Sequence, residues 1–261
     1  MREAAANPLN YFEQLFGLTR DAARQLVRPP SHSLRSLAAR RLARQAILLT
    51  GIFSTCVVAL MILFDAREIA LMPPRGTPEL WPVRIFTDFG KDTYVLWALV
   101  TVLLVIALAS PLLNGTARGR LLRLGTRVQY LLFAVLASVL FAQIVKWVAG
   151  RGRPFVGGKA DPFNFAPFTG TEAHFSFPSS HAVTGFALAF AVGAVWPHLR
   201  LVMLIYAVAI AGSRLLLLAH HPSDVVAGAL IGVLCAMAVR YWFAARHLCF
   251  SIHGDGHIVP L

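Results

Sequence analysis

Residues 128–149, VQYLLFAVLASVLFAQIVKWVA, decide the fold of this chain. The stretch carries one charge, Lys146, and it reaches the roughly 20 apolar residues that a helix needs to cross a bilayer. An uninterrupted apolar run of this length is typical of a transmembrane helix. The sequence therefore predicts a membrane-spanning helix that runs up to Gly150.

Similar apolar runs lie on both sides of this stretch. Together they predict six membrane-spanning helices, over residues 46–64, 94–113, 128–149, 181–197, 200–219 and 223–244. The composition agrees, because 57% of the 261 residues are hydrophobic and only 14% are charged. We expect an all-α membrane protein with three parts: a basic segment over residues 1–45, a six-helix bundle over residues 46–246 and a short tail over residues 247–261.

The net charge of +12 comes mainly from basic residues in short segments between the apolar runs. This distribution indicates membrane topology and not a nucleic-acid-binding surface. If six helices alternate in direction, the arginine-rich segments share one side, which is then cytoplasmic together with both termini. Those segments contain Arg44, Arg118, Arg120, Arg123, Arg127, Arg200, Arg240 and Arg246. Residues 65–92, residues 150–180 and the junction around His220 then face the outside.

The segments outside the apolar runs allow fewer predictions. Hydrophobic residues in the N-terminal segment recur at helical spacing, namely Leu9, Phe12, Phe16, Ala23, Leu26 and Val27. This spacing fits an amphipathic helix on the membrane surface, and a frayed soluble tail is an equal alternative. Residues 150–180 are too polar for another span and predict an ordered loop over the bundle, while residues 65–92 are expected to form a lid.

Polar residues gather in three clusters at the predicted outer ends of apolar runs. In the first cluster, Lys146 and Arg153 are seven residues apart, and Gly150 and Gly152 predict a bend that brings the two cations together. A pair of fixed cations suits an oxyanion, because arginine binds two oxygens at once and lysine acts as a point charge. Either residue taken alone is equally well explained by snorkelling to the interface. We interpret Arg151 as such an interface charge.

The second cluster stands where the fourth apolar run begins and contains Ser179, Ser180 and His181. Unpaired backbone amides in the first turn of a helix form an anion site. The two serines either donate their hydroxyl hydrogens to such an anion or simply cap the helix, and this cluster alone does not separate these alternatives. His181 is well placed to act as a general acid.

The third cluster contains Ser213, Arg214, His220 and Asp224. Ser213 and His220 share a helix face, and the proline at 222 ends one helix and suits the first turn of the next. We expect Asp224 to accept a hydrogen bond from His220, which fixes the tautomer and makes the other ring nitrogen a better nucleophile. An acidic residue in a first turn also stabilises the helix, so this simpler explanation of Asp224 stays open. His221 is interpreted as an interfacial neighbour without a role.

In order and spacing, the three clusters resemble the type 2 phosphatidic acid phosphatase superfamily. Its pattern is Lys-x6-Arg-Pro, then Pro-Ser-Gly-His, then Ser-Arg-x5-His-x3-Asp, and this chain matches every position except one. Ser180 stands where the family usually has glycine, which adds a side chain where the backbone approaches phosphate. The resemblance covers Lys146 to Asp224 and the six predicted spans, whereas residues 1–45 lie outside it.

The resemblance implies a lipid phosphatase. A compact polytopic chain of this kind looks bacterial, so we expect it in the inner membrane with its outer face, and thus its active site, toward the periplasm. His220 attacks phosphorus to give a phosphohistidine, Asp224 supports it, and His181 protonates the leaving oxygen and then activates water. The residues that would hold the phosphoryl oxygens are Lys146, Arg153, Ser179, Ser180 and Arg214. No metal or other cofactor is expected, because the cations perform the same electrostatic task. The expected partners are a phosphorylated lipid and the bilayer, and the oligomeric state is left open.

Two other functions are compatible with parts of this pattern. A phosphotransferase would form the same phosphohistidine and pass the phosphate to another lipid acceptor. A lipid-binding or transport relative without catalysis would be expected to lack His220, His181 or Asp224, which are all present. A soluble haloperoxidase has a similar pocket but lacks a row of apolar spans. The motifs do not distinguish phosphatidic acid, phosphatidylglycerol phosphate, undecaprenyl diphosphate and the phosphates of lipid A as substrates.

Overall fold

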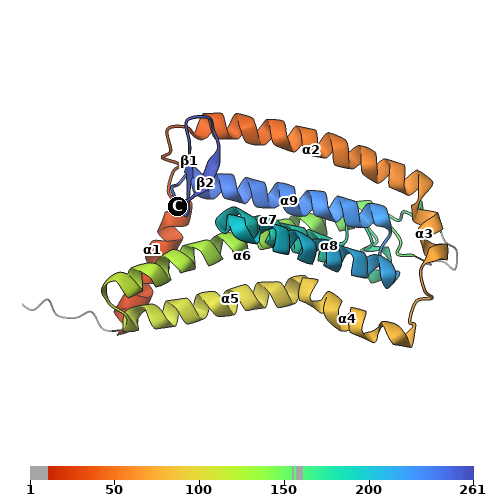
Figure 1. Ribbon diagram of the computed structural model, residues 1–261, viewed down its shortest axis with the longest axis horizontal. Coiled ribbons are helices and arrows are strands. Elements are labelled where there is room, and N and C mark those ends of the chain that lie inside the picture. Colours follow the sequence, from red (N-terminus) through yellow and green to blue (C-terminus); the bar gives the residue numbers. More distant parts are fainter. Residues whose placement is uncertain (1–10, 155, 157–160) are drawn as a thin grey trace, which may run out of the picture.

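Long helices run side by side through the computed structural model, which describes residues 11–154, 156 and 161–261 (Figure 1). They are α2 (Arg35–Leu63), α5 (Asp92–Ala109), α6 (Gly115–Ala149), α7 (Ser180–Val195), α8 (Arg200–Leu216) and α9 (Pro222–Ala244). Each contains most of one predicted apolar run. Helices α2 and α6 begin earlier than their apolar runs, in arginine-rich stretches. Alanine, leucine and arginine favour the early start of α2, whereas α6 begins early in spite of Gly115 and Gly119.

Among the described residues, five helical segments are long and apolar enough to cross a membrane. Helix α7 is the exception, since it is apolar but shorter. It lies at the centre of the bundle, packed against α6, α8 and α9, and most of its side chains are buried. Helix α9 approaches it very closely: a Cβ atom at Gly228 would lie 2.7 Å from the Ser179 carbonyl oxygen. Glycine therefore permits the contact that joins the start of α7 to the start of α9.

One end of the bundle, which we call the α1 end, carries α1 (Tyr11–Val27) and a hairpin of β1 (Phe250–Ile252) and β2 (Ile258–Pro260) (Figure 1). Helix α1 runs across this end, transverse to the long helices, and the Tyr11 hydroxyl donates to the Leu108 carbonyl at 2.9 Å. The predicted N-terminal helix is thus present, although Leu9 lies outside the described residues. The hairpin adds a small antiparallel sheet that the sequence did not predict, while the protein is mostly helical as expected.

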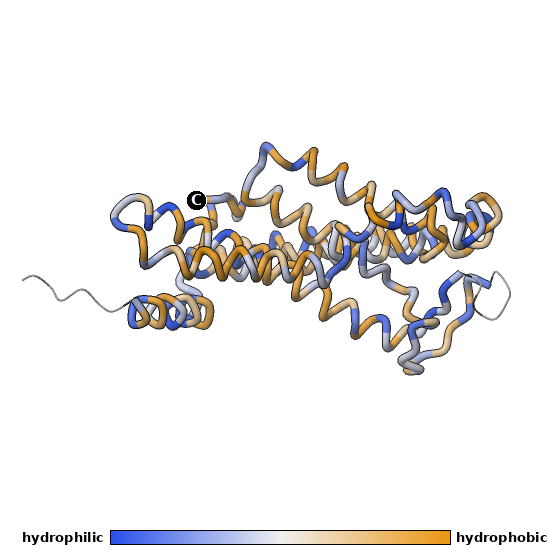
Figure 2. The backbone as a smooth tube through the Cα atoms, turned by 90° about the horizontal axis from the view of Figure 1, so that it is seen from below, coloured by the Kyte–Doolittle hydropathy of each residue, from blue (hydrophilic) through white to orange (hydrophobic). Residues whose placement is uncertain are grey.

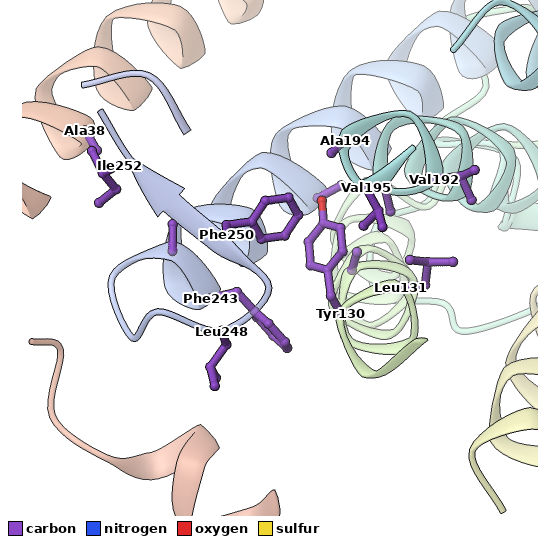
Figure 3. Packing of buried hydrophobic residues seen from close by; sticks show 14 residues of the cluster. Ala38, Tyr130, Leu131, Val192, Ala194, Val195, Phe243, Leu248, Phe250 and Ile252 are labelled. Carbon is purple, nitrogen blue, oxygen red and sulfur yellow. The ribbon is translucent and has the colours of Figure 1, made fainter. Parts of the chain in front are cut away.

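Aromatic packing fixes this hairpin to the bundle (Figure 3). The ring of Tyr130 on α6 meets Phe243 of α9 edge to face at 5.5 Å and Phe250 of β1 at 4.8 Å. Such aromatic pairs are favourable beyond the area that they bury. Phe250 is completely buried and Ile252 nearly so. Strand β1 is therefore part of the core.

The opposite end, which we call the α3 end, is built from short helices and a long loop. Residues 65–92, expected as a lid, form α3 (Asp65–Leu71), η1 (Pro78–Leu80), α4 (Trp81–Thr87) and η2 (Asp88–Gly90). The loop before α7 contains η5 (Glu172–His174). Two other short helices lie elsewhere, since η3 (Ser110–Leu112) contacts α1 and η6 (Pro197–Leu199) joins the end of α7 to the start of α8. Figure 2 shows apolar residues along the long helices and hydrophilic residues mostly toward the two ends. The three polar clusters lie at the α3 end.

Candidate active site

Helix α6 ends at a glycine that redirects the chain. Gly150 adopts a left-handed conformation with φ of 56°, and a Cβ atom there would collide with the Ala166 carbonyl. Lys146 stays in the last turn of α6, while Arg153 lies in the loop beyond the turn. The predicted bend between the two cations is therefore observed.

The loop over residues 175–179 connects all three clusters. The Lys146 ammonium donates to the Phe175 carbonyl at 2.8 Å, and the backbone N–H of Ser179 donates to the Asp224 carbonyl at 3.0 Å. Between them, the Ser176 carbonyl lies 2.8 Å from His220 Nδ1. Segments that are far apart in the sequence thus meet at one short stretch of backbone.

The contact with Ser176 decides the tautomer of His220. A carbonyl oxygen only accepts hydrogen bonds, so Nδ1 carries the proton and Nε2 keeps its lone pair. His220 is 2% exposed, and this burial lowers its pKa to about 3 although the neighbouring Asp224 carboxylate opposes the shift. The imidazole is therefore neutral near pH 7 and presents an unprotonated Nε2.

Asp224 is completely buried, and its carboxylate accepts several hydrogen bonds. The donors to Oδ2 are the Ser176 hydroxyl at 2.6 Å and the backbone N–H of His221 at 2.8 Å. His220 Nδ1 lies 3.8 Å from the same oxygen, beyond hydrogen-bond distance. The His221 ring is closer, at 3.2 Å. Orientation of His220 thus comes from Ser176, and Asp224 acts on it through its charge.

The prediction that His221 is an interfacial neighbour without a role is wrong. It is 1% exposed and forms a reciprocal capping box with Asp224 at the start of α9. Because the proline at position 222 takes the first helical position, His221 is the N-cap residue, with an extended backbone. His221 therefore helps to hold the Asp224 carboxylate.

Arg151 is completely buried, which corrects its interpretation as an interface charge. Its guanidinium contacts Asp224 Oδ1 at 2.5 Å and Asp65 Oδ2 at 2.8 Å. It also donates to the Pro162 carbonyl from Nη2 at 2.7 Å and from Nε at 3.0 Å. The turn at Gly150 directs the side chain inward beneath the loop. One cation therefore links two buried carboxylates, as burial of charge requires.

Asp65 and Ser223 complete this buried network, and neither is predicted from the sequence. Asp65 begins α3 and accepts the backbone N–H of Ser223 at 3.1 Å as well as the Ser223 hydroxyl. In the sequence, Asp65 resembles an ordinary polar residue after an apolar run. Ser176 was missed for a similar reason, since a serine in a loop carries no motif.

Ser179 and Ser180 stand at the start of α7, where the first backbone amides face the α3 end. Ser179 is the N-cap residue and is completely buried, but its side chain does not bond to the helix backbone. Across the part of the chain that the structure describes, its hydroxyl has no hydrogen-bond partner. Helix capping therefore does not explain this hydroxyl, which is free to bind a ligand. Ser180 is the first helical residue.

His181 and Arg214 bring the second and third clusters together. His181 is half-buried and interacts electrostatically with Arg214, His220 and Lys146. Arg214 Nη1 donates to the Thr87 hydroxyl at 3.1 Å, and the Ser213 hydroxyl lies 2.9 Å from the same oxygen. The segment before α5 therefore positions the Ser213 and Arg214 side chains of the third cluster.

A cavity of about 250 Å³ opens at Ala219, the residue that precedes the buried His220. Its lining includes Arg153 and Arg214, together with Arg75, Arg84, Leu217 and Ala219. Arg153 also donates to the Glu172 carbonyl at 3.0 Å and pairs with its carboxylate at 3.3 Å. Within the described ranges, no group of three or more His, Cys, Asp or Glu residues is arranged to hold a metal ion. The arrangement offers a neutral imidazole base, several cations and helix-start amides to one anionic group.

Known proteins match the part of the chain that holds the three clusters. The PAP2 superfamily matches residues 127–248, the stretch that holds the three clusters. The lipid A 1-phosphatase of Rhizobium johnstonii is 32% identical over 77% of this chain and 82% of its own length. The bacitracin transport permease protein BcrC of Bacillus licheniformis is 28% identical over 68% of this chain and 89% of its own. A crystal structure of a transmembrane PAP2 type phosphatidylglycerolphosphate phosphatase from Bacillus subtilis aligns with a TM-score of 0.46 and 19% identity, covering 75% of this chain and 94% of that one.

Proposed function

This chain belongs to the PAP2 superfamily, and from that premise we propose that it hydrolyses a phosphomonoester or diphosphate on a membrane lipid through a phosphohistidine intermediate. Its phosphatase class follows from the similarity to a lipid A 1-phosphatase over most of both chains. The observation that carries the mechanism is the hydrogen bond between His220 Nδ1 and the Ser176 carbonyl. It leaves Nε2 as the nucleophile.

In the first step, His220 Nε2 forms a bond to phosphorus while the bond from phosphorus to the lipid oxygen breaks. His181 donates a proton to that oxygen, so the lipid leaves as an alcohol or a monophosphate. The positive charge that develops on the imidazole is stabilised by the Asp224 carboxylate 3.8 Å from Nδ1. His181, now neutral, can then serve as a base.

In the second step, His181 removes a proton from water, whose oxygen attacks phosphorus as the bond to His220 Nε2 breaks. Inorganic phosphate leaves and the imidazole returns to its starting form. Phosphoryl transfer depends mainly on positioning and on stabilising spread negative charge. In this proposal the phosphoryl oxygens are held by Lys146, Arg153, Arg214, the first amides of α7 and the hydroxyls of Ser179 and Ser180.

The apolar helices and the bacterial relatives make this a bacterial membrane protein. We further propose that α7 is the sixth membrane-crossing helix, short because protein surrounds it, and that the α3 end faces the periplasm. Arginines gather where α2 and α6 begin, which supports a cytoplasmic α1 end with both termini. Helix α1 would then lie on the cytoplasmic membrane surface.

The test is phosphate release by the purified His220→Ala variant, assayed in detergent against the wild type. The substrate panel contains phosphatidic acid, phosphatidylglycerol phosphate, undecaprenyl diphosphate and lipid A, with lipid A the first candidate because of the named relative. We expect loss of at least about 10³-fold, since no other group would form the covalent intermediate. Wild-type rates in the variant would refute the nucleophile. Label from a lipid diphosphate that appears in a second lipid would instead indicate a phosphotransferase.

A further inference from the structure

The cavity at Ala219 is lined by more positive charge than one transferred phosphoryl group requires. Arg153 and Arg214 belong to the proposed phosphate site, but the same cavity of about 250 Å³ is lined by Arg75 and Arg84. These two residues come from the segment between α2 and α5. Four arginines therefore line one small cavity.

Carboxylates neutralise little of this charge. Arg153 pairs with Glu172 at 3.3 Å, but the Glu172 side chain is 88% exposed, so water screens that pair. In the parts of the chain that the structure describes, no ion pair joins Arg75, Arg84 or Arg214 to a carboxylate within 4.0 Å. Burial lowers the pKa of Arg153, Glu172 raises it, and Arg75 lowers it further. Arg75 is therefore close enough to repel the proposed phosphate-binding cation.

Snorkelling to the bulk membrane surface is the simpler explanation for an exposed arginine. The surroundings of Arg84 disfavour it. Its Nη2 donates to the Thr77 carbonyl at 3.0 Å, which ties the side chain to the turn before α4. The neighbouring residues that are exposed and suited to the lipid interface are instead apolar, namely Trp81 and Ile85. Helix α4 thus carries an apolar exposed surface while Arg84 lines the cavity.

We propose that Arg75 and Arg84 form a subsite for a second anionic group on the lipid headgroup. The second group lies beside the phosphoryl that His220 attacks, and its charge balances the cations that the first phosphate leaves uncompensated. The substrate then carries at least two phosphates, either as a diphosphate or as a second phosphate elsewhere on the headgroup. This inference rests on the proposed phosphatase function of the His220 site.

Matched pairs of substrates test the subsite. One pair is phosphatidic acid and the diacylglycerol diphosphate with the same acyl chains, and the other is a glucosamine disaccharide lipid with one or with two phosphates. We expect Arg75→Gln/Arg84→Gln to lower kcat/KM for a two-phosphate substrate at least about tenfold more than for its one-phosphate partner, because charged hydrogen bonds are lost. Arg67→Gln, an exposed arginine on α3, is the matched control and should change neither.

The outcomes separate the subsite from the catalytic proposal. A selective loss of kcat/KM for diacylglycerol diphosphate indicates that the subsite binds the second phosphate of a diphosphate. A selective loss for the disaccharide lipid with two phosphates indicates that it binds a phosphate elsewhere on the headgroup. Equal losses on all substrates, or none, would overturn the subsite. If the wild type releases phosphate from none of them, the proposed function fails, and binding of inorganic diphosphate and phosphate to the purified protein still tests the subsite. The wild type should bind diphosphate at least about tenfold more tightly than phosphate. If the Arg75→Gln/Arg84→Gln variant kept the same preference for diphosphate, the subsite would be refuted.

Discussion

Replacing Arg151 with leucine would leave two buried carboxylates without their cation. The guanidinium contacts Asp65 at 2.8 Å and Asp224 at 2.5 Å, and all three side chains are completely buried. Removing one partner of a buried ion pair costs about 3–5 kcal/mol, because the remaining charge is neither solvated nor compensated. For a chain of this size, that destabilisation corresponds to a fall in Tm of roughly 10 °C.

The activity of Arg151→Leu should also fall, for a reason that is separate from stability. Arg151, Ser176 and His221 together hold the Asp224 carboxylate near His220. Misplacing a catalytic group by about 1 Å can lower the rate by up to about 10²-fold. We therefore expect a lower kcat at a temperature where the variant is fully folded.

Thermal unfolding in a single detergent, followed by circular dichroism, measures the first effect. Arg67→Leu on α3 is the matched control, because Arg67 is exposed, and its Tm should stay close to that of the wild type. Asp65→Asn should lower the free energy of unfolding less in the Arg151→Leu variant than in the wild type, because in the variant it removes a charge that is already unpaired. Arg151 would not compensate the two carboxylates if Arg151→Leu had the same Tm as Arg67→Leu, or if the effects of Arg151→Leu and Asp65→Asn on the free energy of unfolding were additive.

Three further predictions concern Ser176, His220 and Glu68. Ser176→Ala removes the 2.6 Å hydrogen bond to Asp224 and should lower the free energy of unfolding in detergent by about 1.5–3 kcal/mol. It should lower kcat less than His220→Ala does, because the backbone carbonyl that orients His220 remains at position 176. His220 has a pKa of about 3 when folded and 6.5 as its ordinary value, so its contribution to stability is complete above pH 6.5 and is lost as the pH falls toward 3; Tm measured across this range should decline less in His220→Asn. Burial, with smaller effects of nearby carboxylates, raises the pKa of Glu68 to about 7 from 4.5, so stability is complete below pH 4.5 and falls as the pH rises through 7. Glu68→Gln should therefore raise Tm above pH 7 and leave it unchanged below pH 4.5, and an equal gain at both would contradict the assignment.

The helices were predictable because a membrane span is a local property of the chain. Length and hydropathy over about 20 residues suffice, and no distant partner needs to be known. The bend after Lys146 was predictable for the same reason, since Gly150 is read directly from the sequence. Short helices at the α3 end and the β hairpin were not, because neither α3 nor the segment from Phe250 to Pro260 has a strong periodic pattern.

The sequence by itself determined the membrane class, the approximate positions of the long helices and the three clusters with His220, His181 and Asp224. The tertiary structure alone decided what holds those residues in place. Arg151 meets Asp65 across 86 positions of the chain, and His220 meets the Ser176 carbonyl across 44. Such contacts join residues whose local sequence is unremarkable, and they arise only because the turn at Gly150 and the close packing of α7 on α9 bring the segments together. The residue types set the available chemistry, whereas packing sets the distances on which charge compensation and proton position depend.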